Sequence, residues 1–582
     1  MNELNVVQTR CCGIFNQSRH RVCSRPPLGM TSSFASKLGT NYCPPDEEVT
    51  EIKTLLVGPT LRLKRLADEI TEMQKVINKL AAERAELSAY VEAHKALISP
   101  VRRLPLDVMQ EIFVACLPIH RNCVMSAREA PILLGRICSA WRTLSLSTPR
   151  LWASLHIVEP SRPWELSASA AASFEEKLAQ RLETAKTWLG RSGHCPLSIS
   201  LEGGRIPFGG PMGVTFPHHV PGLPQSSRFV EALIPFASRW RRLNIAISPM
   251  PTILSTLTEH DVPILQHVTI HERPEPGPVP ETQWSSFGIF NGPQLSAFSI
   301  SARSYSPTDL PVRWGQLTVL SMADITWSFE ISSATAVQVL SWCPELRVCH
   351  LGIHDPSTSG SPGLISTIEC AFLQTLELEC VFPAFTLREM FSRLALPDLR
   401  HFKLRGYCPE ESQRMLSFSY LFDASQRLES LDISTDTFMK DSLLELFRSL
   451  PPTMLQLQIS HAWSPSGVHP LNDDALAVLT PPLDDPAPTC PALRDLILVR
   501  CDALSDTALV RFVESRMAST HCSRLKRVQI QFTRQRQLDL LASLRAFTDA
   551  GLDLTLSYPP PEASNFSPWL GLNEPESQLW AP

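Results

Sequence analysis

The residues that could do chemistry occur as short, isolated groups. Glu202-Gly-Gly-Arg and Phe208-Gly-Gly-Pro are rich in glycine, but no Lys-Ser/Thr pair and no strand-glycine-helix setting accompanies them to hold a phosphate. His218-His219 has no carboxylate or cysteine at ligand spacing. Asp473-Asp474 and Asp484-Asp485 suit helix starts and loops, because aspartate accepts hydrogen bonds from N–H groups there. No nucleophile, base and orienting group can be assembled, so we expect no catalytic residue, no cofactor and no enzyme activity.

The 16 cysteines do not follow a metal-site pattern. Cys11, Cys12, Cys23 and Cys43 lie near the N-terminus, but no Cys-x-x-Cys pair occurs there to form half of a zinc tetrahedron. The first residues also lack an apolar run after a basic start, so we expect no secretory signal. Reduced thiols and a cytoplasmic and/or nuclear location follow as expectations, with no metal site.

Composition limits the class of protein. A chain of 582 residues with 43% hydrophobic and 19% charged residues is typical of a globular protein with two or more structural units. The formal net charge of -5 gives no general basic field, so nucleic acid is not an expected partner. The 50 prolines predict many short elements, and no segment predicts a membrane-spanning helix.

A long amphipathic helix is expected after an unstructured N-terminal segment. Residues 1–58 lack lasting periodicity and predict a disordered lead, and Gly58-Pro59-Thr60 predicts a helix start at 59. Apolar residues then follow on alternating three- and four-residue steps, which predicts a coiled coil over 59–99. Arg84 and His94 interrupt this stripe, whose apolar members are Leu63, Leu66, Ile70, Met73, Ile77, Leu80, Leu87, Val91 and Ile98.

Two partners remain open for the stripe. It could pair with a second copy of the chain, giving a homodimer, or pack on the protein's own next domain. A parallel dimer would place Gln74 and Ser88 opposite Glu69 and Glu83, which provides no basic partner for either glutamate.

A small helical module is expected over 100–155. Val108, Ile112 and Phe113 share one face of a first helix, and a second helix is expected over roughly 131–144. Pro149 ends any continuation before Leu151-Trp152. Such a short module buries little surface alone, so it must dock on a neighbour or share its core with the next domain.

The order and spacing of these residues resemble the F-box, by which substrate receptors attach to the Skp adaptor of SCF-type cullin-RING ubiquitin ligases. The F-box-like proteins abundant in fungi have a similar entry after a heptad helix. The match consists of Leu104-Pro105, Val108, Ile112-Phe113, Leu117-Pro118, Ile137-Cys138, Trp141-Arg142 and Leu151-Trp152. The stretch from Ile119 to Ala130 is longer than the family pattern. The resemblance implies adaptor contacts by Leu104, Pro105, Ile112, Leu117, Ile137 and Trp141.

An apolar pattern recurs from residue 240 and predicts a leucine-rich-repeat-like solenoid over 240–557, one short strand and one return segment per turn. Helix-like return segments include Ser442 to Leu450 and Ser505 to Met517. The segment 156–239 is expected to be a linker or irregular first repeats with a Pro/Gly-rich loop, and 558–582 a Pro-rich tail. The pattern is anchored at Trp240, Leu265, Leu295, Leu317, Leu346, Leu373, Leu399, Leu428, Met454, Leu493 and Leu525.

These patterns together predict an α/β (α+β) chain: a coiled-coil helix, an F-box-like module, then the repeat domain. Cys490 to Asp506 is similar to the cysteine-containing leucine-rich repeat of F-box receptors, although most other turns are degenerate. The resemblance implies a noncatalytic adaptor that binds Skp and an unknown target protein; the alternative is a repeat scaffold without ligase association. Candidate target-binding residues on the strand face are Arg347, Glu377, Lys403, Asp432 and Arg494.

Overall fold

The computed structural model describes two compact units, residues 1–105 and 106–582. Within them it describes residues 32–160, 168–203, 226–247, 250–272, 282–302, 305–323, 331–354, 367–381, 388, 390–407, 419–435, 438, 440–461, 471–482, 488–501 and 503–559. The first 31 residues of the expected disordered lead, the His218-His219 loop, Asp484-Asp485 and the tail from 560 lie outside the described residues.

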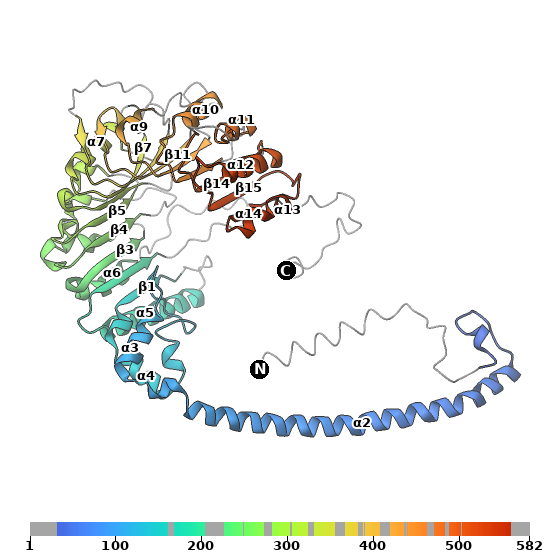
Figure 1. Ribbon diagram of the computed structural model, residues 1–582. Helices are drawn as coiled ribbons and strands as arrows, with labels where there is room; N and C mark the ends of the chain where they lie inside the picture. The colour runs from blue at the N-terminus through green and yellow to red at the C-terminus, as the bar shows by residue number, and fades with distance from the viewer. Residues whose placement is uncertain are drawn as a thin grey trace. The chain divides into compact units, whose positions relative to one another are not determined.

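The first unit is dominated by helix α2 (Asp46–Leu97), which runs for 52 residues (Figure 1). It begins at Asp46, so the predicted start at 59 was wrong, and residues 46–58 belong to the helix rather than to a disordered lead. Pro45 precedes the first turn, and three acidic residues there interact favourably with the helix N-terminus. Pro59 lies inside the helix, where it removes one N–H donor; Gly58 and Thr60 beside it are also poor helix formers, but the better formers Leu55, Leu56, Leu61 and Arg62 lie within one turn on each side.

The segment before α2 folds back on its first turns. It contains the short 3-10 turn η1 (Ala35–Lys37), and Lys37 Nζ lies 3.0 Å from Glu48 Oε2. The Tyr42 hydroxyl donates to the same carboxylate at 3.0 Å. The hydrogen bond from Lys37 therefore holds the pKa of Glu48 below its usual range.

The second unit contains a large sheet in which every pair of neighbouring strands is parallel (Figure 1). The fourteen strands of this sheet within the described residues follow one another in chain order, and each parallel pair is joined by a crossover connection on the return-segment side. The strands are β1 (Ser154–Val158), β2 (Leu197–Glu202), β3 (Trp240–Ala246), β4 (His267–His271), β5 (Ala297–Ser301), β6 (Val319–Met322), β7 (Val348–His354), β9 (Thr375–Val381), β11 (His401–Tyr407), β12 (Ser430–Ser434), β13 (Gln456–Ser460), β14 (Asp495–Cys501), β15 (Arg527–Phe532) and β16 (Asp553–Ser557). Two further short strands, β8 (Ile368–Glu369) and β10 (Leu394–Ala395), pair with each other. The mixed helix-and-strand α/β class is thus confirmed.

The connections place helices and 3-10 turns along one face of the sheet (Figure 1). Between β3 and β6 the described connections hold 3-10 turns such as η9 (Gly288–Asn291). The longer helices are α5 (Ala168–Arg191), α6 (Ser226–Leu233), α7 (Ser333–Trp342), α9 (Ser419–Ala424), α10 (Lys440–Ser449), α11 (Asp473–Val478), α12 (Asp506–Ala518), α13 (Leu540–Ser543) and α14 (Arg545–Asp549). Helix α12 begins after Ser505 as predicted, whereas α10 begins two residues before the expected Ser442. Among the described helices none is long and apolar enough to cross a membrane.

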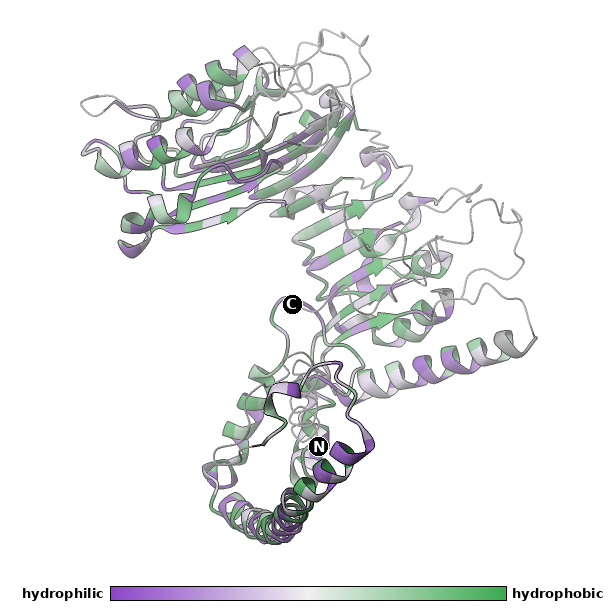
Figure 2. Ribbon diagram, turned by 90° about the vertical axis from the view of Figure 1, so that its right-hand side faces the viewer, coloured by the Kyte–Doolittle hydropathy of each residue, from purple (hydrophilic) through white to green (hydrophobic). Residues whose placement is uncertain are grey.

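The core lies between the strands and their return segments. All eleven predicted anchors are buried, and apolar and polar residues alternate along the strands (Figure 2). Trp240 and Leu265 stand three residues before Leu243 and Val268, which pair with each other. Trp152, also buried, stands at the same offset before Leu155 of β1. The module's final tryptophan is therefore the anchor of the first strand.

The sheet accordingly begins at Ser154, and the predicted boundary at 240 was wrong. Segment 156–239 contains most of β1 together with α5, β2 and α6, which agrees with the predicted irregular first repeats rather than with a linker. The anchor pattern did not reveal β2, since the position three before Ile199 is Pro196 and the register shifts between Leu197 and Ser198.

The C-terminal end of the sheet is capped by a buried carboxylate. Asp506, fully buried at the start of α12, lies 2.6 Å from Arg534. It also accepts hydrogen bonds from the backbone N–H groups of Gln537 and Leu538, at 2.9 and 2.7 Å. Burial raises the pKa of Asp506, but Arg534 and these N–H groups outweigh burial, so the pKa lies below its ordinary value.

We expect Asp506→Asn to destabilise this end by about 3 kcal/mol, because it leaves Arg534 without its buried carboxylate. Amide hydrogen exchange at Gln537 and Leu538 should accelerate by about 100-fold, measured by mass spectrometry or NMR. In the unaltered protein the same protection is present above about pH 4 and is lost as pH falls through the lowered pKa. Asp549→Asn, in an exposed pair with Arg545, is the control. Unchanged exchange in Asp506→Asn would contradict the capping role.

Candidate interaction surfaces

The helical module at the start of the second unit contains α3 (Leu106–Ala115), η3 (Leu134–Arg136), α4 (Ser139–Leu146) and η4 (Pro149–Trp152). The single helix expected over 131–144 was wrong, because Cys138 has extended backbone angles and separates η3 from α4. Its Sγ accepts a hydrogen bond from the Trp141 N–H at 3.4 Å and so caps α4. The Arg142 Nε donates to the Gly135 carbonyl at 2.8 Å, which holds η3 against α4.

One set of the module's apolar residues forms its core. Phe113 is fully buried, and its ring centroid lies 4.8 Å from that of Trp141. The Trp152 Nε1 donates to the Ser145 carbonyl at 2.8 Å. The Trp152 ring also packs edge-to-face on Trp188 of α5, at 4.8 Å between centroids. The module therefore shares a continuous core with the sheet.

A second set remains at the surface of the same helices. Ile112 on α3 and Ile137 before α4 are 42% and 55% exposed, and Val108 is also exposed. Leu117 and Trp141 are half-buried. The two remaining predicted adaptor residues belong to the first unit, where Leu104 is half-buried and Pro105 is exposed.

The long stretch from Ile119 to Ala130 is used at the edge of the sheet. Val124 forms a parallel bridge with His156 of β1, and the His156 N–H donates to the Cys123 carbonyl at 2.7 Å. Asn122 reaches further: its Oδ1 accepts from the Ser154 and Ser198 hydroxyls, at 2.9 and 2.8 Å. The stretch thus covers β1 and ties it to β2.

The face of the sheet opposite the return segments carries a continuous row of mostly polar residues. Direct strand pairing places one residue of each strand in this row, which changes from hydroxyl and amide groups to charged groups near its middle. In chain order the row consists of His156, Ser200, Asn244, Thr269, Ser299, Ser321, His350, Glu377, Lys403, Asp432, Gln458, Ile497, Gln529 and Thr555.

The charged middle of the row contains three of the predicted target-binding residues on adjacent strands. Lys403 Nζ lies 2.7 Å from Glu377 Oε2. Arg405, two residues along β11, donates to both carboxylate oxygens of Asp432 at 2.8 and 2.9 Å. The same guanidinium reaches the Ser460 hydroxyl at 3.2 Å. Burial raises the pKa of Asp432 above its ordinary value, although Arg405 opposes the shift.

The other two predicted target-binding residues lie elsewhere. Arg347 and Arg494 are exposed, but each stands one residue before its strand, so neither belongs to the central row. Arg405 was not predicted. Its position, two residues after Lys403 in a strand, would have placed it on the same face.

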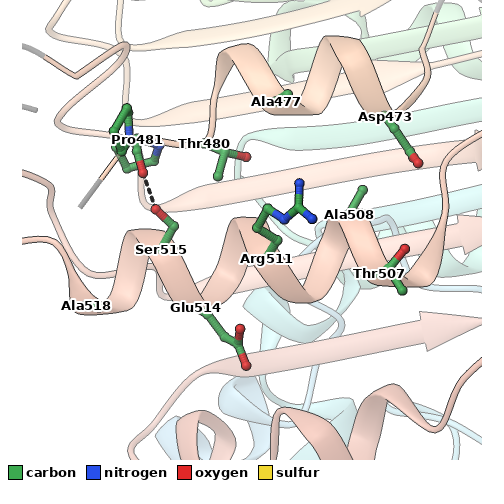
Figure 3. A pocket seen from close by; sticks show the side chains of 11 residues that line it. Asp473, Ala477, Thr480, Pro481, Thr507, Ala508, Arg511, Glu514, Ser515 and Ala518 are labelled. Carbon is green, nitrogen blue, oxygen red and sulfur yellow. Dashed lines mark hydrogen bonds between the residues drawn. The ribbon is translucent and has the colours of Figure 1, made fainter. Parts of the chain in front are cut away.

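The return-segment side has a groove of about 610 Å³ between α11 and α12 (Figure 3). Arg511 lies between the two helices, and the Ser515 hydroxyl donates to the Pro481 carbonyl. Asp473 is occupied as a hydrogen-bond acceptor, at 2.7 Å from the Ser505 hydroxyl.

Two of the described cysteines, Cys343 and Cys370, are buried. Burial raises the pKa of Cys343 to about 12 and that of Cys370 to about 11, so both thiols stay protonated at neutral pH. No group of three metal-ligating side chains occurs within the described part of the chain.

Comparison with known proteins gives no match, neither to a protein-family model nor to a curated protein sequence.

We expect Arg405→Leu to lower stability at neutral pH by about 2 kcal/mol, because Asp432 loses the guanidinium that pairs with it. The pKa of Asp432 should then rise further, so the destabilisation is full above that pKa and shrinks as pH falls toward about 4. Thermal unfolding at several pH values measures this difference. Combining Arg405→Leu with Asp432→Asn is the control, and it should remove the pH dependence. A pH-independent loss in Arg405→Leu alone would contradict the pairing as its cause.

Proposed function

We propose that this chain is a noncatalytic substrate receptor of an SCF-type cullin-RING ubiquitin ligase. Its F-box-like module would bind the Skp adaptor, and its sheet would bind a target protein. Transfer of ubiquitin would belong to the partners, with the receptor raising the effective concentration of target lysines near the charged enzyme. A cytoplasmic and/or nuclear location belongs to the same proposal.

The observation that carries the proposal is the division of the F-box-like residues into two sets. Phe113, Leu151 and Trp152 are buried and serve the fold, whereas Ile112 and Ile137 remain exposed on the same module. If the pattern existed only to close a core, the second set would be expected to be buried as well. Exposed apolar side chains beside a fixed core are typical of a docking surface.

The departure from the family pattern does not weaken this proposal. The long stretch 119–130 makes its polar contacts with β1 and β2, through Asn122 and the Val124 bridge. Its additional length thus has a role at the sheet edge that is separate from Ile112 and Ile137.

For the sheet, we propose a leucine-rich-repeat-like solenoid whose polar row binds the target. One strand of the large sheet per turn, pairing of these strands in chain order and, in most turns, a buried anchor at a fixed offset support the repeat interpretation. The concentration of charge at Glu377, Lys403, Arg405 and Asp432 makes this part of the row the best candidate for target selection, since charged groups set specificity and association rate.

We expect Ile137→Glu to weaken binding of the full chain to the purified Skp adaptor by about 30-fold, the effect of losing an apolar hot spot. Ile112→Glu and a Leu104→Ala, Pro105→Ala variant should weaken it as well. Surface plasmon resonance or a pull-down measures the loss. Leu541→Glu is the matched control, because Leu541 is 54% exposed on α13, far along the chain from the module. If the unaltered protein does not bind the adaptor, the receptor function is excluded and a repeat scaffold remains.

A further inference from the structure

Helix α2 carries an apolar stripe that the described residues of the first unit, from 32 onward, do not bury. Because the helix begins at Asp46, the seven-residue pattern extends further toward the N-terminus than the sequence prediction, to Leu56. Val49 and Ile52 continue it but are half-buried near the segment that folds back on α2. The exposed stripe consists of Leu56, Leu63, Leu66, Ile70, Met73, Ile77, Leu80, Leu87 and Val91, whose exposed fractions lie between 37% and 68%.

We propose that α2 packs side by side against α2 of a second copy of this chain, in antiparallel direction and over the full length of both helices. This inference does not depend on the proposed ligase function. Two residues inside the stripe decide the direction of pairing: Pro59 and Arg84 take the places of apolar residues. In a parallel pair equivalent residues meet, so the two Arg84 guanidinium groups would face each other between apolar layers. Like charges there are strongly unfavourable.

An antiparallel pair removes this conflict. When Asp46 lies level with Leu97 of the other copy, the numbers of any two residues that lie level with each other add up to 143. Arg84 of one copy then lies level with Pro59 of the other. By symmetry this pairing occurs twice, once toward each end of the paired helices. Between Leu56 and Leu87 the remaining layers are fully apolar: Leu56 with Leu87, Leu63 with Leu80, Ile70 with Met73, and Ile77 with Leu66.

The positions flanking the stripe fit the same register. Each heptad has two positions in the apolar stripe, and the residue immediately before the first of them flanks the stripe. In an antiparallel pair of helices, these flanking residues approach the corresponding residues of the other helix. Arg62 of one copy thereby approaches Glu83 of the other, and symmetry gives this opposite-charge pair twice. A shift of one heptad in either direction would instead bring Glu69 toward Glu69 or toward Glu83. A two-heptad shift can pair Arg62 with Glu69, but it leaves Leu87 and Val91 uncovered.

The dipoles of the two helices also favour this arrangement, because each N-terminus lies beside the C-terminus of the other helix. The acidic first turn of one copy comes level with His94 and Lys95 of the other. Direction, layer composition and flanking charge thus select the same register.

Light scattering of the full chain at micromolar concentration, with reductant to exclude disulfide-linked species, tests the pairing. We expect twice the chain mass of 64.8 kDa. Arg62→Glu and Glu83→Arg should each weaken the dimer by about tenfold or more, because each creates two like-charge contacts. The double variant should restore the dimer. Mixing the two single variants should also restore it, as a heterodimer in which both contacts have opposite charges, and this rescue shows that each variant is folded.

Arg65→Glu and Glu86→Arg are the matched controls, since these residues have the same types but face away from the stripe. Neither should change the mass. A monomer at all concentrations tested would overturn the proposal. So would a dimer weakened by Arg62→Glu but not by Glu83→Arg, which would indicate the shorter register, and so would singles that neither the double variant nor mixing rescues. Adaptor binding by a monomer would leave the proposed function intact.

Discussion

The second unit depends on one repeated burial constraint. In most turns a large apolar side chain is buried at a fixed place, three residues before the core-facing residue of the strand. That core-facing residue pairs directly with the core-facing residues of the two neighbouring strands. The anchor fixes where each strand begins, and its burial makes a shift of one residue costly, because such a shift would turn the core face of that strand to solvent. Direct pairing of every polar residue in the row follows from this fixed register. The strand register of a surface that extends over fourteen strands is thereby fixed from the interior.

The same constraint explains why the helical module and the sheet are not separable. Trp152 closes the module through its hydrogen bond to Ser145 and also serves as the anchor of β1. Packing of Trp188 against it extends this contact into α5. A module too small to be stable alone therefore gains its core from the sheet, while Ile112 and Ile137 are left for other contacts.

The anchors show how far the sequence could be interpreted. A single buried leucine before a strand, as at Leu373 or Leu399, leaves a clear apolar pattern, and these positions were predicted correctly. Trp152 was assigned to the helical module alone, because its place in the module's residue pattern already explained its burial and did not show that it is also the anchor of β1. The start of α2 was missed for a different reason: Gly58-Pro59 is a strong local signal, but its cost is small against the many hydrogen bonds of a 52-residue helix.

In the charged part of the row, Glu377, Lys403 and Asp432 were recognised as strand-face residues. The sequence could not reveal that Arg405, not Lys403, holds Asp432, because both basic residues lie on the same face of β11 and the Lys403 ammonium pairs with Glu377 instead. Arg347 and Arg494 were assigned to the same face, although the strands begin one residue later. Errors of one residue at element boundaries are enough to move a side chain off a surface.

The bridge between Val124 and His156 has a consequence for the behaviour of the protein in a crowded solution. A parallel sheet exposes unpaired backbone groups at its first strand, and such an edge can recruit strands from unfolded or neighbouring chains. Here the His156 N–H is already bound by the Cys123 carbonyl, and the Asn122 side chain holds this cover in place through Ser154 and Ser198. Residues 122–124 thus leave fewer backbone groups at the first edge of the sheet free to pair with another chain.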